Sequence, residues 1–283
     1  MKLILRKNDS ATSLLLFIYN NYMAKTAKDS IKLSSLLEIL QVFGKSETAI
    51  RMSLSRAVKG GLLSNNKDAN EVSYALTPEG KKAILHWNEG VMHFFKRYVL
   101  RNSPWDNKWY FINAEITAAT KDNKAEFLDK LQQLGFAQVN TYTWVTPYYQ
   151  YEEVWDLIRK YHFTDAIVEI HGEMKIHKDM NKFLNDIYHI EKLKTAYRSF
   201  IDTYSGKLQE IRQLYKEPSF VENGLALPIL NELGWSFFSI ASDDAALPRQ
   251  ILPEWEGDQA ALLMRELRGL LLEATYVYFE KFN

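Results

Sequence analysis

Three observations predict a mainly helical α+β fold. Apolar residues recur at helical spacing over much of the chain, whereas they alternate every second residue near 62–76 and in parts of 109–170. The chain has 283 residues, more than a typical domain of about 100–200 residues. Hydrophobic residues make up 47% of it, which is enough apolar material for packed cores. We expect three domains, over residues 1–98, 99–175 and 176–283.

Charge is balanced over the whole chain but unevenly distributed along it. Thirty-five Lys and Arg cancel thirty-five Asp and Glu. Residues 1–90 nevertheless carry a net charge of +5, residues 91–170 carry −1, and residues 171–283 carry −4. A basic first third suits a domain with an acidic partner such as nucleic acid, although ordinary domains also reach this charge. Overall neutrality therefore does not exclude a DNA-binding protein.

Composition excludes several kinds of site. The chain has no cysteine, which rules out disulfides, thiolate nucleophiles and cysteine-ligated zinc or iron–sulfur sites. No apolar run approaches the roughly 18–20 residues of a membrane span. The longest run near the start, residues 14–19, lacks the cleavage site of a signal peptide. We expect a cytoplasmic protein without membrane contact, bound metal or cofactor.

The first domain begins with two predicted helices. Apolar residues fall at helical spacing between Ser10, the expected N-cap, and Tyr22. Ser35 stands three residues before Glu38, the arrangement of a capping box, and so predicts the start of a second helix. Gly44 is expected to end this helix, because glycine tolerates the positive φ found at helix C-termini.

A third predicted helix, over residues 46–59, carries the candidate DNA-binding residues. Ser46 is its expected N-cap and Glu47 lies in its first turn. Its predicted buried stripe consists of Ile50, Leu54, Ala57 and Val58. Its outward face carries Thr48, Arg51, Met52, Ser55, Arg56 and Lys59. Short side chains let a helix enter the major groove of DNA, and arginine reaches base edges or phosphates there. We expect these six outward residues to bind DNA.

A β-hairpin is predicted after the third helix. Alternating residues follow Gly61 and continue to Leu76, on both sides of a polar tip at 65–70. Lys67 in this tip is a further candidate DNA contact, and Pro78 begins another helix. Three helices followed by a hairpin are the order of the winged helix-turn-helix. The alternative is a helical packing module that uses the same fold to bind protein.

The middle third predicts a strand, a helix, two strands, a helix and a strand. These elements are expected at residues 109–116, 123–134, 136–148, 152–161 and 166–170. This βαββαβ order is ferredoxin-like, a fold with many functions. The nucleases of CRISPR adaptation resemble this topology and carry a metal-binding Asp on the first strand, where this chain has Asn113. We expect an inactive linker and dimerisation domain, with a metal-dependent nuclease as the alternative.

The last third is predicted to be helical. Near-heptad apolar spacing over 178–215 predicts one long helix or two stacked helices. Further helices are expected near residues 225–233, 235–241 and 257–281. Trp235 and Trp255 either line an aromatic pocket or pack in the core, and the core position is the commoner one.

Three segments make the chain similar to a known family over nearly its whole length. They are Ser46–Arg56 followed by Gly60-Gly61-Leu62, Trp105-Asp106-Asn107-Lys108-Trp109, and Leu252-Pro253-Glu254-Trp255-Glu256-Gly257. In order and spacing they resemble the PaaX family of bacterial repressors of aromatic-acid catabolism. Glu256 departs from the family, in which proline more often follows the tryptophan.

The resemblance implies a homodimer that binds double-stranded operator DNA and represses a phenylacetate catabolic operon. It also implies that an aryl-CoA thioester, typically phenylacetyl-CoA or a related acyl-CoA, releases the DNA; it assigns no effector-binding residues. The sequence has no Gly-rich phosphate loop and no recognisable nucleophile motif, so we expect no enzyme. The alternatives are a nuclease or an acyl-CoA-binding enzyme built on the central and C-terminal domains.

Overall fold

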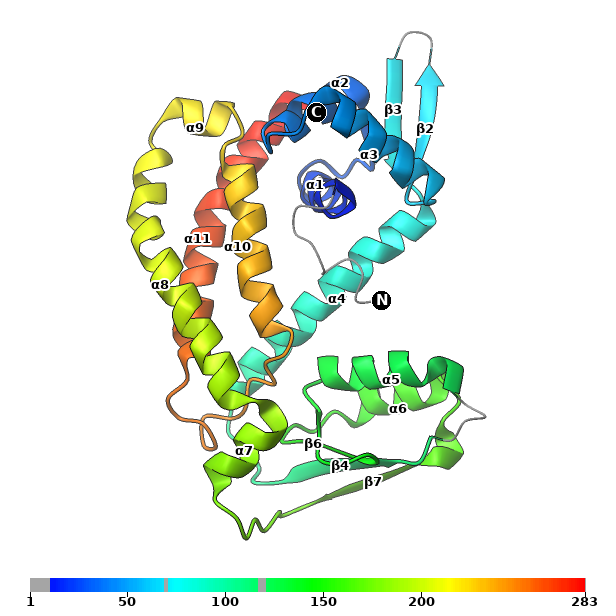
Figure 1. The fold of residues 1–283 in the computed structure, drawn as a ribbon, viewed down its shortest axis with the longest axis vertical. Helices are drawn as coiled ribbons and strands as arrows, with labels where there is room; N and C mark the ends of the chain where they lie inside the picture. Colours follow the sequence, from blue (N-terminus) through cyan, green and yellow to red (C-terminus); the bar gives the residue numbers. More distant parts are fainter. Residues whose placement is uncertain (1–10, 69–70, 117–120, 283) are drawn as a thin grey trace. The chain divides into compact units, whose positions relative to one another are not determined.

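The computed structural model describes residues 11–68, 71–116 and 121–282, and Figure 1 shows their helices and strands. Helices predominate in these residues, and two small antiparallel sheets accompany them. The mainly helical α+β class is therefore confirmed. The chain divides into two compact units, which are described separately below. Unit 1 consists of Met1–Asn88, Phe200–Ser239 and Ala260–Asn283, and unit 2 of Glu89–Ser199 and Ile240–Gln259.

Unit 1 begins with α1 (Ala11–Thr26), β1 (Ser30–Lys32) and α2 (Leu33–Gln41). The expected N-cap Ser10 lies outside the described residues. The capping box at Ser35 is wrong: α2 starts directly after β1 with Lys32 at the N-cap, and Ser35 is buried inside the helix. Pairing of β1 with β3 fixes the entry into α2, and this pairing is invisible in local sequence spacing. Gly44 has a φ of +70° in the turn after α2, as expected.

The third predicted helix is confirmed as α3 (Glu47–Lys59). Ser46 is its N-cap, and the Ser46 hydroxyl accepts a hydrogen bond from the Ala49 backbone N–H at 3.3 Å. This bond satisfies one of the free N–H groups of the first turn. Ile50, Leu54 and Ala57 are buried against α1 and α2, which fixes the opposite side of α3 toward solvent.

A hairpin follows α3, as predicted, but residues 65–68, which were expected in its polar tip, are paired strand residues. It consists of β2 (Leu63–Asp68) and β3 (Glu71–Leu76), and the sheet order is β1-β3-β2. Leu63 pairs with Leu76 at its base. Thr77 caps the next helix, α4 (Pro78–Arg101), by accepting from the Gly80 N–H at 3.1 Å and donating to the Leu62 carbonyl at 3.1 Å. The predicted helix start at Pro78 is thus confirmed.

Helices late in the chain complete the core of unit 1. They are α9 (Pro218–Glu222) and the unit 1 parts of α8 (Ile190–Leu214), α10 (Ala226–Ala241) and α11 (Glu256–Phe279). The Tyr22 and Phe279 rings are 5.5 Å apart, and the Tyr22 hydroxyl donates to the Phe282 carbonyl at 2.8 Å. Leu227 and Phe279 share one hydrophobic cluster with the residues that bury α3. The N-terminal helices therefore pack against residues of α10, α11 and the segment that follows α11.

Unit 2 contains the predicted order of strands and helices in its middle part. The elements are β4 (Trp109–Ala114), α5 (Lys121–Gln133), β5 (Ala137–Gln138), β6 (Thr143–Thr146), α6 (Tyr151–Lys160), the 3₁₀ turn η2 (Thr164–Ala166) and β7 (Ile167–Gly172). The sheet order is β5-β6-β4-β7, with each neighbouring pair antiparallel. Ile112 and Trp144 pack with α5 and α6 in one core. The helices therefore cover one face of this sheet (Figure 1).

Two helices, not one, form the predicted segment 178–215. They are α7 (Met180–Tyr188) and α8, separated at His189, whose φ is +54°. The prediction of two helices at 225–233 and 235–241 is wrong, because α10 continues through Gly234. An interior glycine costs a helix only about 1 kcal/mol, and buried Leu233 and Phe237 hold the helix on both sides of it.

The segment between α10 and α11 is held to unit 2 by buried polar groups. Arg101 is fully buried and binds Asp258 in two places at 2.8 Å, and its guanidinium also donates to the carbonyls of Leu247 and Leu252. The indole N–H of Trp255 donates to Asp244 at 3.1 Å. Trp255 is buried, so its core interpretation is confirmed. Within the described residues, no helix is both long and apolar enough to cross a membrane.

Candidate nucleic-acid interface

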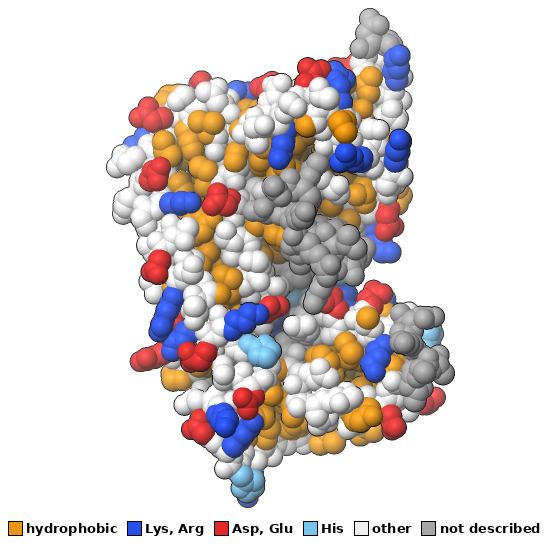
Figure 2. Space-filling view, in the orientation of Figure 1, with side chains coloured by type: hydrophobic (Ala, Val, Ile, Leu, Met, Phe, Trp, Pro, Cys, Tyr) orange, Lys and Arg blue, Asp and Glu red, His pale blue; other side chains and the backbone are white. Residues whose placement is uncertain are grey.

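One side of α3 presents all six predicted binding residues to solvent. Together they line one shallow hollow on the surface of unit 1, and we name them the exposed α3 face: Thr48, Arg51, Met52, Ser55, Arg56 and Lys59. Met52 is 50% exposed, although it is apolar. Figure 2 shows Lys and Arg side chains in blue over the part of unit 1 that holds α3 and the hairpin. The exposed α3 face therefore combines short side chains with cations.

The exposed α3 face follows from the buried stripe opposite it. Ile50, Leu54 and Ala57 are at most 3% exposed, and they are spaced by four and three residues. Residues on the other side of a helix at this spacing must point outward. Ser53, at the border, donates its hydroxyl to the Ala49 carbonyl at 2.7 Å. The core of unit 1 therefore fixes the rotation of α3 about its axis.

Arg51 forms an ion pair with Glu47 of the same helix. Its Nε donates to the Glu47 carboxylate at 2.8 Å, and its Nη2 lies 2.7 Å from the same oxygen. Both side chains are about half exposed, and exposed pairs four residues apart stabilise a helix by only about 0.2–0.5 kcal/mol. A phosphate or base edge can therefore displace Glu47 at small cost.

Arg56 and Lys59 lie in the last turn of α3. Neither forms an ion pair in the part of the chain that the structure describes. Glu38, a carboxylate that could have neutralised Arg56 within the protein, forms no ion pair with it in these residues. The two cations are exposed and available for an anionic partner.

Lys67 lies on the hairpin, apart from the exposed α3 face. It is exposed on β2 opposite Val72, and it does not line the α3 hollow. Residues 69–70 of the predicted wing tip lie outside the described residues. An ion pair of 3.0 Å joins Lys32 of β1 to Glu71 of β3. Glu71 pairs with Asp68 next to the hairpin tip, so this ion pair neutralises a charge there.

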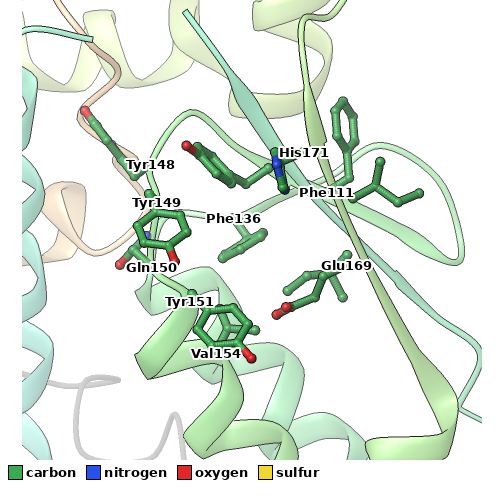
Figure 3. A pocket seen from close by; sticks show the side chains of 12 residues that line it. Phe111, Phe136, Tyr148, Tyr149, Gln150, Tyr151, Val154, Glu169 and His171 are labelled. Atoms are coloured by element: carbon green, nitrogen blue, oxygen red, sulfur yellow. The ribbon is translucent and has the colours of Figure 1, made fainter. Parts of the chain in front are cut away.

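Unit 2 contains an aromatic hollow that sequence reasoning missed. Figure 3 shows Tyr149, Tyr151 and Glu169 around this opening beside the sheet. Burial raises the pKa of Glu169 above its ordinary value, and burial together with a hydrogen bond to Asp106 raises the pKa of Tyr110 to about 12. These residues come from separate strands and loops, so only the run of tyrosines at 148–151 could have indicated the site.

A second hollow in unit 2 lies where α7 gives way to α8. Trp144, His189 and Lys192 are among its lining residues. Asp186 and Asp243 also line it, so its charge is mixed. The left-handed conformation of His189 creates the bend between the helices. Sequence spacing predicted this bend only as one of two alternatives.

The first strand of the middle sheet carries no carboxylate at the position expected of a nuclease. Asn113 occupies an exposed position on β4. Among the described residues, no three side chains of Asp, Glu or His come together as a metal-binding group. No observation in this part of the chain favours the nuclease alternative.

Comparison with known proteins places these elements in one family. The family model described as PaaX-like protein matches residues 10–80, and the model of the PaaX protein central Cas2-like domain matches residues 102–184. The chain is 21% identical over 258 residues to the transcriptional repressor PaaX of Escherichia coli strain K12, covering 90% of this chain and 78% of that protein.

A solved structure has a similar fold. The uncharacterized protein Rv0674 from Mycobacterium tuberculosis superposes with a TM-score of 0.53 at 15% identity, covering 94% of this chain and 97% of that chain. At this identity the likeness concerns the fold alone. The two family models match in order along the chain, and they span the exposed α3 face and the sheet of unit 2. The chain belongs to the PaaX family.

Proposed function

We propose that this protein is a sequence-specific, DNA-binding transcriptional repressor. The observation that carries the proposal is the exposed α3 face, where two arginines, a lysine and three small or flexible side chains share one surface. The relative in Escherichia coli is named a transcriptional repressor, which supports the same role here. We assign the first domain, residues 1–98, to the winged helix-turn-helix class.

In the proposed interface, some residues contact base edges and others contact phosphates. α3 enters the major groove, and Ser55 and Thr48 are short enough to let its backbone approach the bases. Arg56 reads a base edge, while Lys59 at the end of the helix binds phosphate. Arg51 leaves Glu47 for the DNA, and Lys67 on the hairpin contacts the sugar–phosphate backbone.

The proposed repressor is a homodimer. Residues 99–175 form a ferredoxin-like dimerisation domain and residues 176–283 a helical effector domain. Two-fold symmetry requires a pseudo-palindromic operator with half-sites about 34 Å apart, or a multiple of that spacing. The protein acts without catalysis, in the cytoplasm where its operator lies. Support for these assignments comes from the family and from the element order of unit 2.

An acyl-CoA thioester such as phenylacetyl-CoA is the proposed effector, and a phenylacetate catabolic operon the proposed target. Family membership alone supports both. The two hollows of unit 2 are the places to look for the effector, since both combine aromatic and polar lining. Titration with phenylacetyl-CoA, free phenylacetate and CoA should release DNA only with the thioester. Release by CoA alone, or hydrolysis of the thioester, contradicts this part of the proposal.

Selection from random duplexes tests DNA binding without assuming an operator sequence. Full-length protein should enrich a pseudo-palindromic sequence, and that sequence should bind at least about 1,000-fold more tightly than a scrambled duplex. Absence of any enriched sequence, with the protein folded and dimeric, contradicts the proposal. Cleavage of the duplexes in the presence of Mg²⁺ would instead favour the nuclease alternative.

A further inference from the structure

Met52 is the apolar member of the exposed α3 face. It is 50% exposed, and its neighbours on that face are polar or cationic. Thr48 precedes it by four residues, and Ser55 and Arg56 follow it by three and four, so all three lie beside it on the helix surface. Among the described residues, Met52 belongs neither to the hydrophobic cluster of unit 1 nor to the side chains packed against that cluster. Packing of α3 therefore does not account for a methionine at this position.

The charges around Met52 indicate what kind of partner the side chain can meet. A scattered apolar residue on a protein surface needs no explanation by itself. Met52, however, shares its face with the exposed cations Arg56 and Lys59. Contact with an apolar protein surface would take these cations out of water without an anionic partner, which is costly. A polyanion supplies that partner, so DNA is the occupant that suits both the methionine and the cations.

The major groove of DNA offers an apolar side chain one kind of target. Base edges there present hydrogen-bond donors and acceptors, and the C5-methyl group of thymine is the apolar group among them. Methionine is unbranched and has three rotatable bonds, so its thioether end can adapt to the position of that methyl group. The short side chains of Thr48 and Ser55 beside Met52 let the helix backbone approach closely enough for the contact.

We infer that Met52 reads the C5-methyl group of a thymine in each half-site of the operator. The inference rests on the proposed function and deepens it, because it names the base and the chemical group that one side chain contacts. Side chains four residues apart on a helix lie about 5–6 Å from each other, and successive bases are about 3.4 Å apart. The thymine therefore lies within about two base pairs of the base that Arg56 reads.

Replacement of thymine by deoxyuridine tests the contact directly. The replacement removes the C5-methyl group and leaves the hydrogen-bonding groups of the base unchanged. Each thymine of the site selected from random duplexes is replaced in turn, in both half-sites, and the dissociation constant of the full-length protein is measured. One such replacement should weaken binding about fourfold for each half-site, which is the effect of burying one methyl group.

Variants of Met52 decide whether this side chain makes the contact. Met52→Gln keeps the length of the side chain but replaces its apolar end by an amide, so it should bind the thymine and deoxyuridine sites equally. Met52→Leu keeps an apolar side chain and should retain most of the discrimination. Leu262→Ala changes another exposed apolar residue, on α11 at 52% exposure, and should discriminate as the wild type does.

A second measurement tests the methyl group without thymine. Cytosine at the identified position lacks the methyl group, whereas 5-methylcytosine carries it at the same place. The wild type should bind the site with 5-methylcytosine about fourfold more tightly for each half-site than the site with cytosine. Met52→Gln should bind both sites equally.

The outcomes separate this inference from the proposed function. Equal binding of thymine and deoxyuridine sites by the wild type would overturn the inference, and so would a deoxyuridine effect that persists in Met52→Gln. A sensitive thymine far from the base at which Arg56→Ala relaxes specificity contradicts the placement of Met52. In each of these cases a specific site is still bound, so the repressor proposal stands. Selection that enriches no sequence contradicts the proposed function itself.

Discussion

Arg101 offers the sharpest test of how unit 2 is held together. Arg101→Met keeps most of the aliphatic stem but removes the guanidinium that binds Asp258 and two carbonyls. Breaking a buried ion pair on one side costs about 3–5 kcal/mol, because the remaining groups stay buried without their partner. Arg249 also lies 3.2 Å from Asp258 and remains after the change, so we expect the lower end, about 3 kcal/mol.

Hydrogen exchange is the suitable assay, because a chain of two units need not unfold in one step. A loss of about 3 kcal/mol corresponds to about 150-fold faster exchange of amides in the segment 244–258 if local opening governs their exchange. Arg268→Met, at an exposed position of α11, is the matched control and should change stability by less than about 0.5 kcal/mol. Exchange changed by less than about fivefold in Arg101→Met would refute the reasoning.

Three further predictions concern α3 and α4. Ser46→Ala should lower the free energy of unfolding, measured by thermal denaturation, by about 1 kcal/mol, because α3 loses its N-cap acceptor. Unchanged stability would show that Ser46 does not stabilise α3 as its N-cap. Gly80→Ala should lower the free energy of unfolding by about 1–3 kcal/mol, because a Cβ at this position collides with the Leu62 carbonyl. Gly90→Ala, on the same helix, places its Cβ in open space and should not lower it. Lys59→Ala should weaken binding to all DNA sequences alike and reduce the salt slope by about one; a loss confined to one sequence argues against a phosphate contact.

Local sequence signals predicted α3 well because its determinants are local. Ser46, the periodic stripe and the small outward residues all act within one helix. The structure agrees with them, except that Val58 of the predicted stripe is only partly buried. Ser35 failed for the opposite reason. Its spacing to Glu38 fits a capping box, but pairing of β1 with a strand more than forty residues later sets the helix start.

Long-range packing also explains what sequence reasoning missed in unit 2. Nothing near Arg101 indicates that it will bind a segment about 150 residues later, yet this contact fixes the Trp255 segment that the family resemblance singled out. The aromatic hollow likewise combines residues from β4, β7 and the start of α6. The order of strands and helices in the middle third was predictable, because the alternating and helical spacing of apolar residues is a local property of the sequence and does not depend on long-range contacts.

Specificity of DNA binding by Arg56→Ala tests the central claim most directly. The ratio of dissociation constants for the selected site and a scrambled duplex is measured at one fixed salt concentration, with Arg268→Ala as the exposed-arginine control. The account predicts that Arg56→Ala loses about 1–3 kcal/mol on the selected site and much less on the scrambled one, so the ratio falls. An unchanged ratio in Arg56→Ala, with Arg268→Ala behaving as wild type, would contradict base reading by α3.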